Sequence, residues 1–431
     1  MPGTLEKSVF FLKKFVYLHL LVYQTVFWYY YLYVTGVTES WFDMNETKVS
    51  QPLYFKKFTC TCDKCRYNCC RHNWQIRIDK GTYDKYTHLD NDIGKEFLDK
   101  IKVISKDPFI AVIVTNSDGS CHFLDDKGFC SIQLKLGYDY LSRTCRIHPR
   151  SISYINGAFE TFLELSCEEA VRVILFEPEP MVLEQSILEP DGNGNVIPNR
   201  MLTADKYTGA VSAMELFRNL RMTSTVIMQS RKYTVRFRML LLCLLVEQVG
   251  GLLETVQDSN VASLTNDFLK AMETGLYDSL ADQMPDGLVI DFDIVLDILR
   301  DMETKNDQRF NACLRKALEG FGIDPESYSP PALLHNKYKE YYQQYFSDKE
   351  YVFENYIVNH ILMEGFPFNY GKDSGVMVNF ADLLAKYNLI EFLLVGVCGY
   401  HNMFDRWNII NCVSAFARCY DHALKGYLMM E

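Results

Sequence analysis

The sequence has no excess of positive charge. It contains 44 Lys and Arg residues against 55 Asp and Glu residues, which gives a formal net charge of −11. A broad basic face for nucleic acid is therefore not expected, because phosphate binding depends mainly on Lys and Arg. Low-complexity tracts and repeats of fixed period are also lacking, which excludes a disordered or collagen-like protein. With 431 residues, 48% of them hydrophobic, the chain can bury a large core and form two domains.

The sequence also lacks a glycine-rich turn between a strand and a helix, the feature that cradles phosphate in nucleotide-binding α/β folds. Its densest glycine stretch, residues 189–195, has the composition of a loop. This stretch is not a calcium-binding loop either, because the later ligand positions do not follow. A dinucleotide-binding sheet is therefore not expected.

One segment lacks charged side chains altogether. Residues 16–34 contain no Asp, Glu, Lys or Arg and follow Lys13 and Lys14, and 19 residues are enough to span a bilayer. The positive-inside rule would then place the rest of the chain outside the cytoplasm, where its many thiols would oxidise. We therefore expect a cytoplasmic protein in which residues 1–43 are an extension absent from the natural product. A native membrane anchor at residues 16–34 is the alternative.

Cysteine is abundant and concentrated. Of 14 cysteines, nine lie between residues 60 and 167: Cys60, Cys62, Cys65, Cys69, Cys70, Cys121, Cys130, Cys145 and Cys167. A disulfide framework is typical of small domains in oxidising compartments, and a catalytic thiol needs one activated cysteine and not a group. Short spacings followed by distant partners favour thiolate ligation of a metal ion or an iron–sulfur cluster.

The remaining cysteines and the nearby histidines are interpreted differently. The five cysteines Cys243, Cys313, Cys398, Cys412 and Cys419 lie alone in apolar sequence, where burial is the usual role of a free thiol. His72 and His148 are not taken as metal ligands, because a lone histidine near a metal site more often supports a ligand. Residues 121–130 are expected to form two strands around an Asp-Lys-Gly turn.

This pattern resembles the cysteine-cluster domain of flagellin lysine N-methylases, which also occurs in a wider group of zinc- or iron-chelating proteins. The residues that match are Phe58, Cys60, Cys65, Cys69, Cys70, Cys121, Phe123, Leu124, Gly128, Cys130, Thr144, Cys145, Arg146, Pro149, Ser166, Cys167, Glu169 and Ala170. The C-terminal part is similar to the same family at Glu354 to Asn359, Phe366 to Phe368 and Ser414 to His422. Cys62 and residues 1–43 depart from the family pattern.

The resemblance implies methyl transfer from S-adenosylmethionine to lysine side chains of flagellin, with an iron–sulfur cluster, of the 4Fe–4S type, held by cysteines. It implies metal ligation by Cys60, Cys65, Cys69, Cys70, Cys121, Cys130, Cys145 and Cys167. It points to Glu354, Tyr356 and His422 as catalytic residues and to Asn359 and Arg418 as cofactor-binding residues. The alternative is a non-catalytic zinc- or iron-chelating interaction protein. The Cys-x3-Cys-x2-Cys spacing of radical S-adenosylmethionine enzymes is absent.

Apolar residues recur at helical spacing through most of the C-terminal half. Helices are predicted at residues 205–229, 232–249, 259–275, 290–304, 306–320, 335–346, 348–364, 377–399 and 404–428. We therefore predict a mainly α protein: a small cysteine-rich α+β metal or cluster domain at residues 44–175, followed by a larger all-helical domain at residues 176–431.

Overall fold

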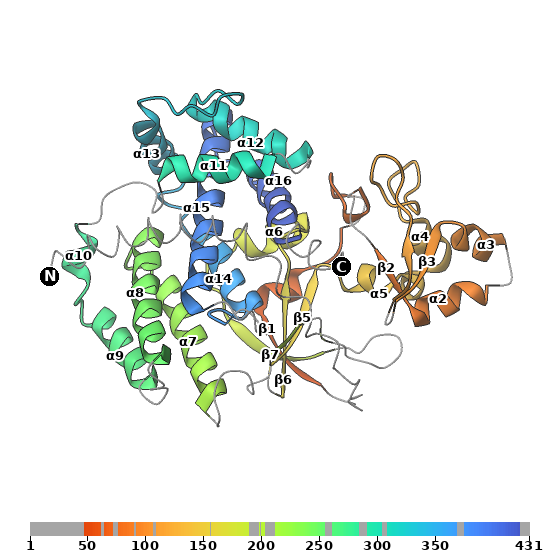
Figure 1. Cartoon of the computed structure of the whole chain (residues 1–431), viewed down its shortest axis with the longest axis horizontal. Coiled ribbons are helices and arrows are strands. Elements are labelled where there is room, and N and C mark those ends of the chain that lie inside the picture. The colour runs from red at the N-terminus through yellow and green to blue at the C-terminus, as the bar shows by residue number, and fades with distance from the viewer. Residues whose placement is uncertain are drawn as a thin grey trace.

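The computed structural model describes most of the chain after residue 46. The described residues are 47–61, 64–71, 76–89, 92–106, 109–155, 157–188, 198, 200–202, 212–254, 261–283, 291–303, 308–368 and 375–422. Figure 1 shows a helical part, a central sheet and a smaller unit beyond the sheet. The mainly α fold class predicted from the sequence is confirmed.

The helical part follows the predicted segments closely. Its helices are α7 (Ser212–Gln229), α8 (Val235–Glu254), α9 (Val261–Glu273), α10 (Asp278–Ala281), α11 (Phe292–Glu303), α12 (Gln308–Phe321), α13 (Leu334–Tyr345), α14 (Tyr351–Glu364), α15 (Val376–His401) and α16 (Arg406–Ala417), with a π-helical turn η8 (Arg418–His422). Each of the nine predicted helices has a counterpart among the described residues, whereas the short α10 was not predicted.

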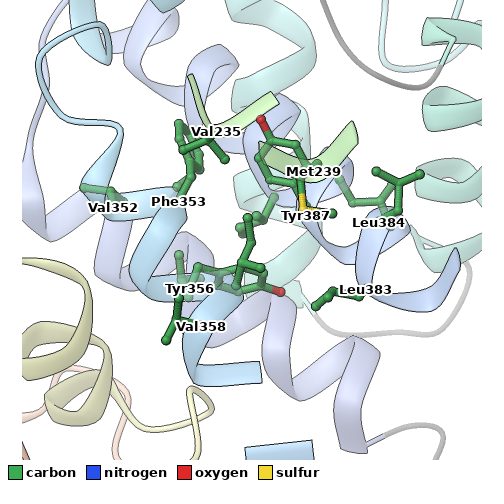
Figure 2. Packing of buried hydrophobic residues seen from close by; sticks show 14 of the residues in the cluster. Val235, Met239, Val352, Phe353, Tyr356, Val358, Leu383, Leu384 and Tyr387 are labelled. Atoms are coloured by element: carbon green, nitrogen blue, oxygen red, sulfur yellow. The ribbon is translucent and has the colours of Figure 1, made fainter. Parts of the chain in front are cut away.

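The centre of this part is α15, which is buried on nearly all sides along its 26 residues. A helix that is apolar all round is stable only inside a protein, and α15 is accordingly surrounded by α8, α11, α12, α13, α14 and α16. Figure 2 shows Phe353 and Tyr356 of α14 and Tyr387 of α15 among the side chains of the core between α8, α14 and α15. The α14 helix ends at Gly365, whose φ of 69° closes the helix in the left-handed conformation.

A five-stranded sheet of strand order β7-β1-β6-β5-β8 packs beside these helices. Its strands are β1 (Lys48–Pro52), β5 (Arg150–Ile155), β6 (Ala158–Leu163), β7 (Leu183–Ile187) and β8 (Arg200–Leu202), and a 3-10 turn η1 (Leu53–Lys57) follows β1. Strand β1 runs parallel to β6 with Val49 opposite Phe159, and antiparallel to β7 with Val49 opposite Ser186. Two of the strands, β7 and β8, therefore lie within the region predicted to be all helical. The helix α6 (Glu168–Leu175) packs against the turn η1 and the helices α14 and α16.

The smaller unit has its own sheet and its own core. It contains β2 (Arg77–Asp79), β3 (Ile101–Lys106), β4 (Phe109–Ile113), α2 (Lys80–Thr87), α3 (Asp92–Leu98), α4 (Ser131–Leu136), η4 (Tyr138–Tyr140) and α5 (Arg143–Ile147). The three strands pair in the order β2-β4-β3. Fully buried members of this core lie between Ile76 and Leu141, whereas Tyr54, Phe58 and Phe162 belong to the larger core with the helices.

None of the helices within the described residues is long and apolar enough to cross a bilayer. The uncharged run at residues 16–34, on which the alternative of a membrane anchor depends, lies outside the described residues.

Candidate functional site

The segment at residues 64–71 carries Cys65, Cys69 and Cys70 and ends in the 3-10 turn η3 (Cys69–Arg71). It is tied to the smaller unit by its backbone, because the Cys121 N–H donates to the Cys70 carbonyl at 2.7 Å. The side-chain amide of Asn68 donates to the Gly128 carbonyl at 3.3 Å. These bonds hold the segment against the turn at residues 121–130.

That turn differs from the predicted pair of strands. Residues 121–130 form successive turns closed by isolated bridges, which pair Thr115 with Cys121 and Leu124 with Cys130. The Asp125 carboxylate accepts backbone hydrogen bonds from Lys127 and Phe129 at 3.0 and 2.8 Å, which replaces the ladder that two strands would have formed. The thiols of Cys121 and Cys130 are still brought near one hairpin-like turn, as the sequence indicated.

The other predicted ligands come from helix starts. Cys130 precedes α4, Cys145 lies in α5, and Cys167 is the N-cap residue of α6. All eight predicted ligands are free thiols: Cys60, Cys65, Cys69, Cys70, Cys121, Cys130, Cys145 and Cys167. Cys62 lies outside the described residues. Among the cysteines set aside as core residues, Cys243, Cys313, Cys398 and Cys412 are buried as expected, and Cys419 is half-buried.

Burial is the main cause of the raised pKa of Cys65, Cys121, Cys130, Cys145 and Cys167, and a negative charge on Cys69 adds to it in each case. The pKa of Cys70 is raised first by its hydrogen bond with Cys69 and then by burial. The pKa of Cys69 itself is lowered to about 7, because the Cys70 thiol donates a hydrogen bond to it and the Arg418 guanidinium lies nearby. Burial is the main cause that raises the pKa of Cys121 to about 11 and that of Cys167 to about 12.

The donor set fits a soft metal in its chemistry. A bound cation would supply positive charge to thiols whose pKa burial raises, and would thereby remove their protons. However, no three His, Cys, Asp or Glu side chains converge as the ligands of one metal ion within the part of the chain that the structure describes. The thiols therefore form a loose group of suitable donors, and their ligand role stays a prediction.

The predicted catalytic residue Glu354 lies fully buried on α14. Its Oε2 accepts from Arg238 Nη1 at 2.7 Å, and Arg231 donates to both carboxylate oxygens, from Nε to Oε2 at 3.0 Å and from Nη2 to Oε1 at 2.9 Å. The Arg238 side chain is only 2% exposed. Glu354 thus balances two guanidinium groups inside the core.

The other C-terminal candidates contact different parts of the molecule. Asn359 donates to the Leu163 carbonyl of β6 at 3.2 Å and accepts from the Tyr54 hydroxyl at 2.5 Å, so that it ties α14 to the sheet. Tyr356 is buried, and the centre of its ring lies 4.6 Å from the centre of the His360 ring. The side chain of His422 lies outside the described residues. The roles proposed for these residues stay predictions.

Comparison with known proteins assigns the chain to a family. Residues 221–427 match the model of the FliB lysine N-methylase C-terminal domain. The chain is 31% identical over 150 residues to the flagellar biosynthetic protein FliU of Salmonella muenchen, a match that covers 32% of this chain and 84% of that protein. The chain belongs to the FliB lysine N-methylase family. We call residues 221–427 the FliB domain.

Two longer relatives are matched over a smaller share of their length. The chain is 31% identical over 161 residues to proteins named lysine-N-methylase from Salmonella typhimurium and Salmonella choleraesuis. These matches cover 35% of this chain and 38% of each relative, so the chain spans less than two fifths of their length. No solved structure matches the chain.

The FliB domain contains a titratable cluster that sequence reasoning missed. Lys386 donates to both oxygens of Glu364 at 2.8 and 2.9 Å and pairs with Asp382 at 3.0 Å, while His360 Nδ1 lies 3.2 Å from Glu364 Oε1. Burial alone would raise the pKa of Glu364, but Lys386 and His360 outweigh it and hold that pKa well below its usual range. The signal in the sequence was the spacing of four residues in both His360–Glu364 and Asp382–Lys386, which places each pair on one helix face.

The FliB domain also contacts the thiol-bearing segment directly. Arg418 Nε donates to the Ser166 carbonyl at 3.0 Å, and Arg418 Nη2 donates to the Tyr67 carbonyl at 3.2 Å. The predicted cofactor-binding residue Arg418 therefore lies between Ser166, which precedes Cys167, and Tyr67, which lies between Cys65 and Cys69 in the sequence. No local sequence pattern could have indicated this contact, since its partners are separated by 252 and 351 positions.

Proposed function

We propose that the protein is a protein-lysine N-methyltransferase that moves a methyl group from S-adenosylmethionine to lysine side chains of flagellin in the cytoplasm. The observation that carries the proposal is the family membership, supported by relatives whose names state lysine-N-methylase and a flagellar biosynthetic role. Its support in the fold is the direct contact between the FliB domain and the cysteine-bearing segment, which makes the two parts of the predicted enzyme one unit.

Methyl transfer to lysine requires a neutral amine. A free lysine has a pKa near ~10.4, so a group of the protein must accept a proton from the ammonium before the nitrogen forms its bond to the methyl carbon and the sulfur–carbon bond breaks. We assign this task to His360 and not to Glu354 or Glu364, because both oxygens of each carboxylate accept hydrogen bonds from charged groups. The His360 Nε2 is buried and has no hydrogen-bond partner within the described residues.

The titratable cluster around His360 suits a cationic side chain. The cluster contains the two carboxylates of Glu364 and Asp382 and the single ammonium group of Lys386. The side chains of Glu364 and Asp382 are 21% and 14% exposed, whereas Lys386 is 5% exposed. The two carboxylates are therefore more exposed than the ammonium group of Lys386.

We further propose that the eight cysteines predicted as ligands include those that hold an iron–sulfur cluster, with zinc as the alternative. One cluster takes at most four thiolates, so the remaining cysteines are either structural or belong to a second metal site. A cluster bound there would provide an iron atom able to hold the methionine part of S-adenosylmethionine. The residues of this chain contribute thiolates, the charge of Arg418 beside Cys69, and the burial that limits access of water.

The decisive experiment starts with anaerobic purification of the full chain, followed by metal analysis, a visible spectrum and incubation with S-adenosylmethionine and flagellin. We expect about four irons and four sulfides per chain, and methyl groups on flagellin lysines detected by mass spectrometry. Cys69→Ser should lose the metal, whereas the matched control Cys243→Ser, at a buried thiol outside the group, should retain it.

A colourless preparation with one zinc ion per chain and no methylated flagellin would favour the non-catalytic interaction protein. Equal metal content in Cys69→Ser and Cys243→Ser would contradict the assignment of the ligands. A variant that loses its metal but still transfers methyl groups would show that the metal is not required for the reaction.

A further inference from the structure

The two chain segments that carry Cys65, Cys69 and Cys167 meet at one pair of arginines from the FliB domain, Arg309 and Arg418. The first segment contributes Tyr67, which lies between Cys65 and Cys69. The second contributes the residues on either side of Cys167, namely Ser166 and Glu168. Both arginines contact both segments, so that this point decides how the thiols are placed relative to one another.

Arg309 is the buried member of the pair. Its side chain is 6% exposed, and its Nη2 donates to Glu168 Oε1 at 2.9 Å. The same Glu168 oxygen accepts the backbone N–H of Tyr67 at 3.2 Å, so one carboxylate oxygen joins Arg309 to the first thiol segment. The Arg309 guanidinium also lies 4.2 Å from the centre of the Tyr67 ring, which is the geometry of a cation–π contact.

The FliB domain fixes Arg309 in turn. Asn411 Oδ1 accepts from Arg309 Nε at 2.6 Å, and Ser414 Oγ accepts from Nη2 at 2.7 Å, so the guanidinium is held in one plane by α16. A third contact strengthens the attachment, because the Arg66 guanidinium lies 4.5 Å from the centre of the Trp407 ring at the start of the same helix. The helix α16 and the turn η8 thus carry the surface on which residues 66 and 67 lie.

We propose that Arg309 and Arg418 are positioning residues that assemble the Cys65, Cys69 and Cys167 thiols and offset the negative charge of a thiolate-ligated metal bound there. The assembly rests on contacts alone, whereas the part concerning metal rests on the proposed function. Thiolates bound to a metal or cluster would leave a net negative charge, and two guanidinium groups beside their backbone neighbours would reduce the cost of that charge in a partly buried site.

The contacts require arginine and not merely a positive charge. Arg309 uses two nitrogens and its planar face at once, and Arg418 uses Nε and Nη2 to span two carbonyls. A lysine ammonium has no planar fork, so it can keep the charge but cannot hold both segments. Substitution of arginine by lysine therefore separates positioning from charge.

The experiment compares Arg309→Lys and Arg418→Lys in the full chain with Arg172→Lys as a matched control. Arg172 lies on α6, five residues after Cys167, but its side chain is 54% exposed and pairs with Glu169 of the same helix. Two quantities are measured: the alkylation rate of each thiol in the metal-free protein by mass spectrometry, and the affinity for cobalt(II) as a probe of thiolate sites.

We expect Arg309→Lys and Arg418→Lys to alkylate several-fold faster at Cys65, Cys69 and Cys167, with Cys243 unchanged, and to bind cobalt(II) about 10- to 100-fold more weakly. Alkylation rates and cobalt affinity equal to those of Arg172→Lys would overturn the proposal. If Arg309→Lys fails to fold, Arg418→Lys still tests the proposal. Arg418 donates to backbone carbonyls at a partly exposed site, so its substitution disturbs the core less. Faster alkylation in a protein without methyl transfer would support the positioning role while the proposed function failed.

Discussion

Gly320→Ala is expected to lower the free energy of unfolding by about 3 kcal/mol or more, because α12 and α15 touch at their backbones. A Cβ at residue 320 would lie 2.8 Å from the Tyr400 amide nitrogen and still closer to the Gly396 carbonyl oxygen. Neither atom belongs to a flexible side chain that could turn away. Both helices are buried along this contact, so the new methyl group has to push whole helices apart. The unfolding midpoint in urea, compared with that of the unmodified chain, measures the effect.

Gly251→Ala is the matched control for this substitution. Gly251 also lies inside a helix, α8, but nothing comes within 4 Å of a Cβ placed there. Alanine at an open helical position should stabilise the protein by about 0.5–1 kcal/mol, since glycine loses more backbone freedom on folding. Equal midpoints for the two variants would show that the backbones of α12 and α15 are not in contact at Gly320.

The helices could be predicted from the sequence because their signal is local. Apolar residues at a spacing of three and four mark α11, α12 and α14 within a single window, and Gly365 marks the end of α14. The predicted boundaries of these three helices agree with the structure within a few residues. Such local patterns can be recognised even when the partners against which the helix packs are unknown.

The central sheet could not be predicted in the same way. Strand β1 pairs with β6 and β7, so that Val49 lies opposite Phe159 and Ser186, more than a hundred positions away. Such strand pairs depend on the packing of the whole chain, so a short stretch of sequence does not indicate which strands will pair. The short strand β8 pairs with β5 by the same kind of distant contact.

In the candidate site, too, only the features with a local sequence pattern could be predicted. The spacing of the cysteines predicted a group of thiols that ligate a metal, and this role stays a prediction, because no three candidate ligands converge within the described residues. The arginines that hold Cys65 and Cys167 in place come from residues 309 and 418, where neither periodicity nor charge pattern singles them out as a pair. Ligand types can be read from a sequence, whereas the groups that orient them depend on the tertiary fold.

Glu354→Gln is expected to destabilise the protein by about 3–5 kcal/mol, because it removes one partner of a buried ion pair and leaves the other charged. The Arg238 side chain is almost fully enclosed, and the carboxylate that remains near it in this variant is Glu350, whose Oε2 lies 3.5 Å from Arg238 Nη2. Glutamine has nearly the same shape as glutamate, so the variant leaves no cavity. The loss of stability therefore measures the effect of removing the negative charge. Asp278→Asn, which removes one partner of the exposed pair with Lys232, should leave the unfolding midpoint unchanged.

The same variant decides between a structural and a catalytic role for Glu354. If the carboxylate only neutralises Arg231 and Arg238, methyl transfer measured well below the unfolding midpoint should fall no further than the fraction of folded protein does. If Glu354 accepts the proton from the substrate lysine, the folded Glu354→Gln protein should lose transfer by about 10²–10⁴-fold at unchanged metal content. The contacts favour the first result, since both oxygens of Glu354 already accept hydrogen bonds from guanidinium groups. An acceptor with both oxygens engaged has to break a charged hydrogen bond before it can take a proton.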